Sequence, residues 1–470
     1  MRSALFTLSL AVPLALLSAG CAMRQDPPPP VVTGAAAGWI DPARQGPLAG
    51  DWWRALGDAR LDALMARALS ASPDLAEAQA RLRAARASVD AARGRQLPQL
   101  GAAAAATTNA QSANGMIPFG KLPGVSRTYD LFDAGFDASW EIDLWGARAS
   151  ATRAAAARGR QAEAQLAATR LSLTAEVARD YIELRSAQAR RANLAAQVDT
   201  LAALAALQQA RLAAGETPRD DSLATHQRLD AARAALAPLS GEAAANAYAL
   251  GVLTGRPPEV MGDLLDTEGP MPHMPQVAWL GLRSDVLARR PDVQAALADL
   301  AAARADADVA HAALFPSLSL TGSIGQQARQ TGDFLAGDSL RYGLGPSLHW
   351  PLFAGGQLRA QLRGARAQAD AAAARYEKAV LAALSDSETA INRHVRAEQA
   401  GEAAQNAAAS ADSRARIARA RFESGEDNRL LSLEAQLTAL AAHASALAAR
   451  TGEAEAYIAL GKALGIAPAP

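Results

Sequence analysis

Cysteine, lysine and aromatic residues are scarce in this sequence of 470 residues. Cys21 is the only cysteine, so no disulfide can form within one chain. Aromatic residues make up 4% of the chain, which disfavours a globular core filled with large rings. Basic and acidic residues balance at a net charge of zero, so composition gives no electrostatic case for binding nucleic acid.

Long apolar runs are also missing after residue 20, although half of the sequence is apolar. Much of that half is alanine, whose small side chain suits long helices with closely spaced axes. A transmembrane helix needs roughly 18 or more consecutive apolar residues, and no such run is present. A body that crosses a membrane would therefore have to do so as closed β-structure.

The first 20 residues have the pattern of a secretory signal that is removed from the mature protein. Arg2 precedes a mostly apolar run, and three small residues lead to Cys21. The leader resembles a bacterial lipoprotein signal, except that Ser18 stands where leucine is usual. This resemblance implies that Cys21 carries N-palmitoyl and S-diacylglycerol groups. The alternative is an ordinary signal in which the cysteine is incidental.

The rest of the chain contains two related copies. Residues 72–100 align without a gap on residues 290–318, with about thirteen identities over the segment. Residues 211–255 align in the same way on residues 421–465. The period, about 200 residues, is too long for a solenoid repeat. Each copy is therefore a sub-domain, and the pair predicts an approximate two-fold within the subunit.

Both copies are expected to have the same order of elements. The first repeat, residues 73–255, is predicted to contain a helix, a β-hairpin at about 97–144, a long helix at 147–214 and a helix at 217–254 that kinks at Pro238. The second repeat, residues 281–465, is predicted to contain a helix, a hairpin at about 317–353 and helices at 357–424 and 429–464. Residues 21–72 hold a proline-rich spacer, residues 256–280 form a linker, and residues 466–470 form a tail.

Two strands in each copy make four in each subunit. Four strands cannot close a barrel alone, and strand edges exposed to lipid are not tolerated. The subunits must therefore oligomerise, and three of them would supply twelve strands, which lies within the range for outer-membrane barrels. The strand count by itself also allows two or four subunits.

Several motifs, in order and spacing, resemble those of TolC-like outer-membrane efflux channels of the lipoprotein branch. They are Trp52-Trp53, SPDL from Ser72, WEIDLWG from Trp140, LGVLTG from Leu250, RRPDV from Arg289, Phe315-Pro316, Pro351-Leu352-Phe353 and Arg421-Phe422 with Gly425. The resemblance implies an α+β membrane protein whose trimer forms a twelve-stranded outer-membrane β-barrel continued by a long α-helical barrel in the periplasm. The N-terminal segment, the linker and the C-terminus would form an equatorial belt, with Trp52 and Trp53 packed in it.

The same resemblance implies a passive duct for drugs or other small molecules. Its partners would be two further copies of the chain, a periplasmic adaptor (membrane fusion) protein, an inner-membrane pump of the RND type and outer-membrane lipid. Within the family, a protein-secretion duct of type I systems or a metal-ion export duct is an alternative. Outside it, the alternative is a lipid-anchored coiled-coil scaffold without a pore, for which four strands with polar loops have no evident use.

The turns between the long helices concentrate charge. Candidate tip and adaptor contacts are Gly215, Glu216, Gly425, Glu426 and Arg429. By resemblance, acids after the second turn close the periplasmic end, where Asp427 is the best match and Glu434 a weaker one. Trimerisation would repeat each acid around the axis. A merely solvated turn is the alternative.

Three tryptophans flank the predicted strands, at Trp140, Trp145 and Trp350. Interfacial aromatic residues would mark the membrane boundary. Simple packing against the helices would explain them equally well. The six histidines are far apart in sequence and show no metal-binding spacing. No catalytic motif or cofactor site is evident, so the sequence predicts a protein that is not an enzyme.

Overall fold

The computed structural model describes residues 39–40, 50–113, 116, 126–275 and 283–466. These residues form two compact units. One contains the described residues within 83–161 and 296–376, and the other contains the described residues within 39–82, 162–295 and 377–466. The predicted signal, Cys21 and the proline-rich spacer lie outside the described residues.

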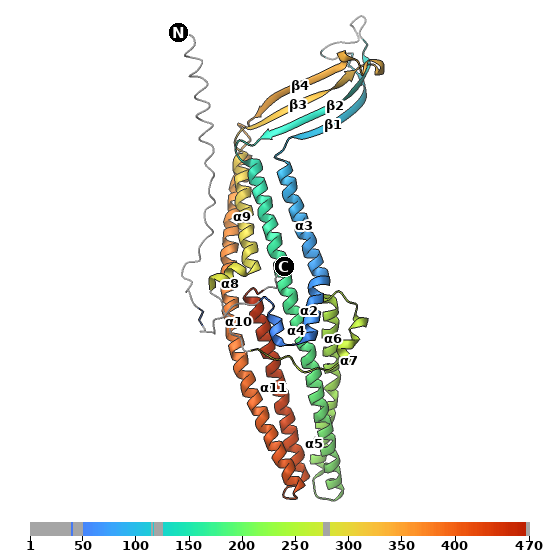
Figure 1. The fold of residues 1–470 in the computed structure, drawn as a ribbon, viewed down its shortest axis with the longest axis vertical. Helices are drawn as coiled ribbons and strands as arrows, with labels where there is room; N and C mark the ends of the chain where they lie inside the picture. Colours follow the sequence, from blue (N-terminus) through green and yellow to red (C-terminus); the bar gives the residue numbers. More distant parts are fainter. Residues whose placement is uncertain (1–38, 41–49, 114–115, 117–125, 276–282, 467–470) are drawn as a thin grey trace. The chain divides into compact units, whose positions relative to one another are not determined.

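The first unit contains one antiparallel sheet with the strand order β1-β2-β3-β4 (Figure 1). The strands are β1 (Gln99–Ala110), β2 (Thr128–Ile142), β3 (Ser317–Ala328) and β4 (Leu340–His349). Each copy supplies one hairpin, and the pairing of β2 with β3 joins the copies. Gly135 lies opposite Gly325 in this pairing, and a Cβ atom on either would come within 2.6 Å of backbone across the ladder. Strands β1 and β4 are left as the two edges.

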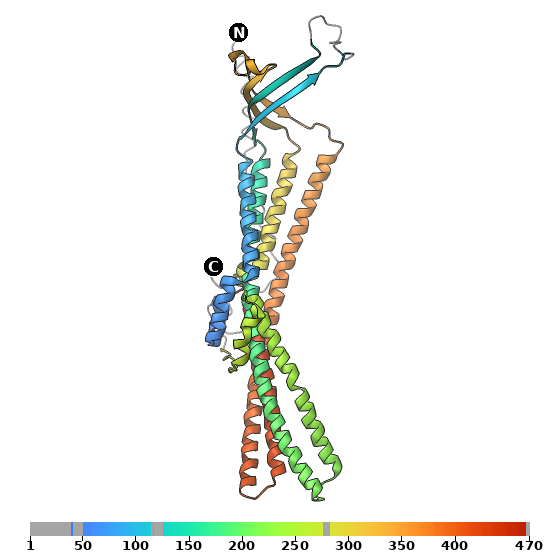
Figure 2. The same cartoon turned by 90° about the vertical axis from the view of Figure 1, so that its right-hand side faces the viewer.

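Each copy also contains a helix of 67 residues, about 100 Å long at the usual rise. These are α4 (Ala147–Ala213) and α10 (Gln357–Glu423), close to the ranges that the sequence predicts (Figure 2). The helix before each hairpin is α3 (Pro73–Gly94) or α9 (Pro291–Ala312). The remaining helices are α2 (Ala59–Ala71), α5 (Arg219–Ala234), α6 (Leu236–Leu253), α7 (Gly262–Asp266), α8 (Arg283–Arg289) and α11 (Arg429–Ala463), with 3-10 turns η1 (Trp52–Leu56), η3 (Pro258–Met261), η4 (Thr331–Asp333) and η5 (Gly337–Ser339).

None of the helices within the described ranges contains an 18-residue stretch apolar enough to span a bilayer.

The helix that follows the first tip is interrupted, whereas its counterpart α11 is continuous over 35 residues. The helix predicted over 217–254 is interrupted near Pro238, as expected, although the break lies three residues earlier, because α5 ends at Ala234 and α6 begins at Leu236. Proline has no N–H to donate to the carbonyl four residues earlier. It is tolerated in the first turn of a helix, and Pro238 is the third residue of α6.

The core of the second unit lies where the N-terminal turn η1 meets α4 and α11. Trp52 is 2% exposed, its ring meets the ring of Tyr457 edge-on, and its carbonyl accepts a hydrogen bond of 2.8 Å from the Tyr457 hydroxyl. The Tyr181 hydroxyl donates to Asp58, whose carboxylate also caps the N-terminus of α2. Both copies and the N-terminal segment therefore pack into one hydrophobic core.

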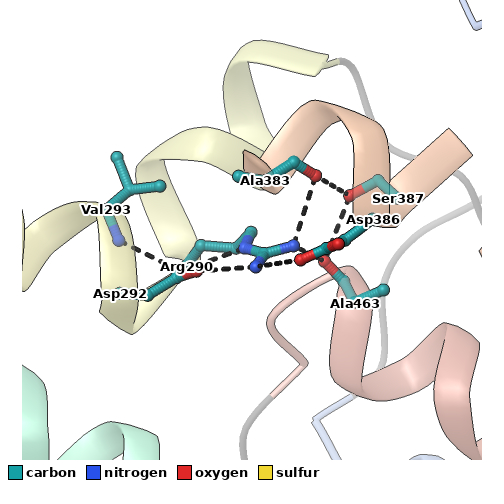
Figure 3. A network of polar contacts seen from close by, with 7 residues as sticks. All are labelled: Arg290, Asp292, Val293, Ala383, Asp386, Ser387 and Ala463. Atoms are coloured by element: carbon teal, nitrogen blue, oxygen red, sulfur yellow. Dashed lines mark hydrogen bonds and ion pairs between the residues drawn. The ribbon is translucent and has the colours of Figure 1, made fainter. Parts of the chain in front are cut away.

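Arg290, which lies between α8 and α9, contacts α9, α10 and the end of α11 in the second copy (Figure 3). Its guanidinium donates to the carbonyl oxygens of Ala383 and Ala463, at 3.2 and 3.0 Å. It also forms ion pairs with Asp292 at 2.6 Å and Asp386 at 3.3 Å. Burial would lower the pKa of Arg290, but hydrogen bonds and charge from the two aspartates outweigh it and raise the pKa.

We expect Arg290→Ala to lower the free energy of unfolding by about 2–3 kcal/mol, because two carbonyls that Arg290 shares with the Ser387 hydroxyl each lose a charged donor and two aspartates lose their partner. Arg290→Lys should restore little, since a single ammonium cannot reproduce the fork of a guanidinium. Arg375→Ala, which removes an exposed pair with Asp299, is the control and should cost less than about 1 kcal/mol. Denaturant unfolding followed by helical circular dichroism measures all three, and equal losses for Arg290→Ala and Arg375→Ala would contradict the assignment.

Candidate functional site: the helical tips and the two faces of the sheet

The two tips share one backbone turn. After α4, Gly215 has φ +76° and the N–H of Glu216 donates to the carbonyl of Arg211 at 2.8 Å. After α10, Gly425 has φ +81° and the N–H of Glu426 donates to the carbonyl of Arg421 at 2.8 Å. A left-handed glycine after the last helical residue satisfies carbonyls that the helix leaves open. The sequence alignment of the two turns therefore corresponds to the same geometry.

The tips differ in how the next helix begins. At the second tip, the Asn428 side chain accepts a hydrogen bond of 3.0 Å from the N–H of Leu431. At the first tip, Pro218 occupies the equivalent capping position of α5 and has no side chain that can accept. The second tip is therefore the more firmly capped, and Asp427 directly precedes the capping residue.

The acid that pairs with the arginine at the end of the long helix differs between the two tips. Glu216 pairs with Arg211 at 3.6 Å, whereas at the second tip Arg421 pairs with Asp427, at 3.9 Å, rather than with Glu426. Glu426 and Arg429 are exposed. Asp427 is less exposed than these neighbours, with 30% of its side chain accessible. Pairs this open contribute little to stability, so the acids are available for another role.

Glu434 connects the two copies near the tips. Its carboxylate pairs with Arg228 at 3.0 Å, which joins α11 of the second copy to α5 of the first. A small apolar cluster lies beneath this pair, formed by Leu201, Leu204, Ala205, Leu229, Leu433 and Leu437. The sequence analysis did not identify Arg228 or Asn428. The sequence does contain a signal for Asn428, because an asparagine directly before a helix is a common capping residue.

A groove between α10 and α11 was also not predicted. It has a volume of about 330 Å³. Its polar lining consists of Asp412, Arg416, Arg419, Gln436 and His443. The His443 ring lies 2.9 Å from the Asp412 carboxylate. The groove therefore offers two arginines and a paired histidine to an incoming polar surface.

The sheet has one polar and one apolar face. On β2, Phe132, Ala134, Phe136 and Ala138 alternate with Asp133, Gly135 and Asp137. The register continues each face across the sheet, because Phe136 lies opposite Ile324 and Ile324 opposite Tyr342, whereas Asp137 lies opposite Ser323. On the polar face, Asp133 pairs with Arg341 of β4 at 2.6 Å. Side chains on the apolar face are exposed, including Tyr342 at 81% and Ile324 at 53%.

The three tryptophans predicted at the strand ends share one kind of contact. Each indole N–H donates to a backbone carbonyl near a junction between helix and strand: Trp140 to Gln96, Trp145 to Pro316 and Trp350 to Leu314, at 2.9, 2.9 and 3.2 Å. Trp145 also stacks on Phe315. All three rings remain at least 39% exposed. An apolar ring surface with a satisfied N–H is the form in which tryptophan occupies a membrane interface.

No group of three or more His, Cys, Asp or Glu side chains in the described part of the chain is placed to hold a metal ion.

The sheet has one polar and one apolar face, and each copy adds a helix of 67 residues. These features together indicate a membrane channel built from strands and long helices. The chain belongs to the outer membrane efflux protein family, whose model matches residues 64–256 and 282–466. These two matches correspond to the two copies found in the sequence. Members of this family are outer-membrane channels and not enzymes.

Individual relatives support this assignment over nearly the whole chain. The pyoverdine export outer membrane protein OpmQ of Pseudomonas aeruginosa is 31% identical, with 88% of this chain and 86% of the relative covered. The outer membrane protein OprJ of the same organism is 30% identical, with 99% and 96% covered. Among solved structures, the outer-membrane channel OprN has a TM-score of 0.83 at 30% identity, with 94% and 98% covered. The open MtrE channel of Neisseria gonorrhoeae has a TM-score of 0.81 at 25% identity, with 94% and 98% covered.

We expect Asn428→Ala to loosen the start of α11, because removing an N-cap acceptor costs about 1 kcal/mol. Amide hydrogen exchange near Leu431 should become roughly five-fold faster. Asn428→Asp should preserve the protection, since it keeps the acceptor. Amides at the start of α5, which have no side-chain cap, serve as the internal control. Unchanged protection near Leu431 in Asn428→Ala would refute the role of this cap.

Proposed function

We propose that three copies of the chain form a twelve-stranded barrel in the outer membrane, continued by a helical barrel in the periplasm. The observation that carries this proposal is the sheet, in which an exposed apolar face, a polar face and two unpaired edges occur together. In lipid an open edge would leave backbone groups without partners. Joining β1 of one copy to β4 of the next would satisfy both edges. The apolar face would then contact lipid, and the polar face would line the lumen.

The assembled protein would serve as the outer-membrane duct of a tripartite efflux system, with a periplasmic adaptor and an inner-membrane pump of the RND type. Drugs or other small molecules would pass through it, and the pump would supply the energy. Two relatives carry names consistent with this role, the pyoverdine export protein OpmQ and the multidrug resistance outer membrane protein MdtP of Escherichia coli. Trp140, Trp145 and Trp350 would lie at the periplasmic boundary of the membrane.

The tips would form both the gate and the contact with the adaptor. In a trimer, Asp427 would occur three times around the axis, and a ring of carboxylates narrows a pore and favours cations. The Arg228–Glu434 pair would hold α11 of the second copy against α5 of the first while the pore is closed. The exposed tip residues Gly215, Glu216, Gly425, Glu426 and Arg429, with the groove between α10 and α11, would receive the adaptor.

We expect the purified protein to migrate as a heat-sensitive oligomer and to conduct ions in planar bilayers. Asp427→Ala should raise the single-channel conductance several-fold, because removing the carboxylate widens the ring and weakens the contact with Arg421. Asp220→Ala is the matched control, since it removes an exposed acid from the first tip, and it should leave the conductance unchanged. Drug permeation through proteoliposomes should likewise be faster for Asp427→Ala than for the wild type and should be unchanged for Asp220→Ala.

Two outcomes would contradict these assignments separately. A lipid-anchored scaffold without a pore would give no conductance in any variant, which would overturn the duct. A conducting protein whose conductance is the same with Asp427 or alanine would leave the duct intact and remove Asp427 from the gate. A conductance that rises only in Asp220→Ala would place the gate at the first tip instead.

We also propose that Cys21 is lipidated and anchors the N-terminus to the outer membrane. The support is the leader sequence and the absence of any other cysteine. We expect Cys21→Ser to abolish incorporation of labelled palmitate and to increase the mass of the protein by the uncleaved leader. As a control for folding, the oligomer should persist when the same variant carries an ordinary secretory leader. A wild-type protein that takes up no label would disprove the anchor.

A further inference from the structure

The polar face of the sheet carries three acidic side chains, all from β2. Asp133, Asp137 and Glu141 are spaced four residues apart, and residues an even number apart in a strand point to the same face. Glu141, near the end of the strand, forms an ion pair with Arg148 at the start of α4. The two aspartates lie further into the sheet, and their surroundings differ.

The charge of Asp133 is neutralised by a fork of hydrogen bonds from β4. Arg341 donates to the two carboxylate oxygens, from Nη2 at 2.6 Å and from Nε at 2.9 Å, and Gln327 donates to one of them at 2.8 Å. Arg341 lies opposite Gly325, which lies opposite Gly135, so no side chain stands between Arg341 and β2 in this row. A bidentate pair of this kind uses the charge of both partners.

Asp137 has no comparable partner. Its row across the sheet contains Gly101 on β1, Ser323 on β3 and Gly343 on β4. Asp137 forms no hydrogen bond or ion pair within the part of the chain that the structure describes, and the charge of Arg341 acts on it only at longer range. Among the acids on the polar face of the four strands, Asp137 is therefore the one whose charge is left without a paired cation.

A hollow with a volume of about 570 Å³ lies beside Asp137. Two rows of the polar face line it, and neither Gly343 nor Gly345 has a side chain that would fill it. An ammonium group has three N–H donors and a positive charge, so it needs one anion and further oxygen acceptors. The side chains that line the hollow supply one carboxylate and three hydroxyl groups, from Asp137, Ser139, Thr321 and Ser323.

We propose that Asp137 and the hollow beside it form a cation-selective site that binds the ammonium groups of small solutes. The site rests on the proposed duct, in which the polar face lines the lumen. Three copies of the chain would then place three such carboxylates around the lumen, where rings of acidic side chains favour cations. This site belongs to the strands, and it is separate from the acids of the helical tips.

The first experiment measures ion selectivity in planar bilayers from the reversal potential under a gradient of KCl. Asp137→Asn removes the charge and keeps the shape of the side chain. We expect the permeability ratio of cation to anion to fall roughly three-fold, which is the Coulomb factor for one unit charge about 7 Å away in water. Putrescine, a small molecule with two ammonium groups, should block the wild-type channel. The concentration that halves the current should rise by a similar factor in Asp137→Asn.

Asp130→Asn is the matched control, because it makes the same chemical change on the same strand. Asp130 lies seven residues before Asp137, and an odd separation places it on the opposite face of the sheet. Its carboxylate accepts a hydrogen bond of 2.7 Å from Thr108, which the oxygen of asparagine can also accept. We expect this variant to keep the selectivity and the putrescine block of the wild type.

A second variant tests the site without changing Asp137. Ser323 lies directly opposite Asp137 on β3, so Ser323→Lys places a cation beside the carboxylate, as Arg341 does for Asp133. It should reproduce the loss of selectivity and of block. The test therefore does not depend on whether Asp137→Asn assembles.

The outcomes separate the site from the duct. Selectivity and block that are unchanged in both conducting variants, Asp137→Asn and Ser323→Lys, would overturn the site and leave the duct intact. A block that is lost in Asp427→Ala and kept in Asp137→Asn would place the cation site at the tips and would also overturn it. A wild-type protein that does not conduct would overturn the duct and, with it, the site.

Discussion

The pairing of β2 with β3 places both copies in one sheet. It leaves β1 and β4 as open edges, and the proposed assembly follows from these two edges. Inside the sheet every strand exchanges backbone hydrogen bonds with a neighbour, and between Phe132 and Ala138 of β2 apolar side chains alternate with polar residues and glycine. At β1 and β4 one side of each ladder has no partner within the subunit. The close approach of Gly135 and Gly325 brings the two hairpins together where any side chain would separate them. Two open edges and an exposed apolar face are the features on which the proposed oligomeric barrel rests.

The two copies have diverged where each performs a different task. In the second copy Arg290 ties α9 to α10 and to the end of α11, whereas the corresponding residue of the first copy is the buried Ser72. The helix after the first tip breaks at Ala235, and its counterpart α11 runs without interruption and begins with an asparagine cap. Helix α11 also carries Glu434, whose carboxylate pairs with Arg228 of the first copy. The Arg228–Glu434 contact between the copies thus rests on side chains that the duplication does not share, whereas the pairing of β2 with β3 uses the backbone.

Much of the architecture could be predicted because it depends on local signals. Glycine after a long proline-free run indicated both tips, alternating residues indicated the strands, and the internal alignment indicated that both copies have the same order of elements. The break at Ala235 was displaced from the proline that causes it, because Pro238 is accommodated in the first turn of the next helix. The indole contacts of Trp140, Trp145 and Trp350 could not be predicted, since each acceptor carbonyl comes from a different part of the chain.

By itself, the sequence determined the duplication, the lengths of the helices, the alternation of the strands and the positions of the turns, because these properties depend on neighbouring residues. Only the tertiary structure decided which residues of one copy contact which residues of the other. The pair Arg228–Glu434 joins residues 206 positions apart, and no spacing in the sequence distinguishes these two from other acids and bases on exposed helices. This contact arises because the packing of α11 against α5 brings two otherwise solvated charges within hydrogen-bonding distance, and that packing depends on segments far apart in the chain.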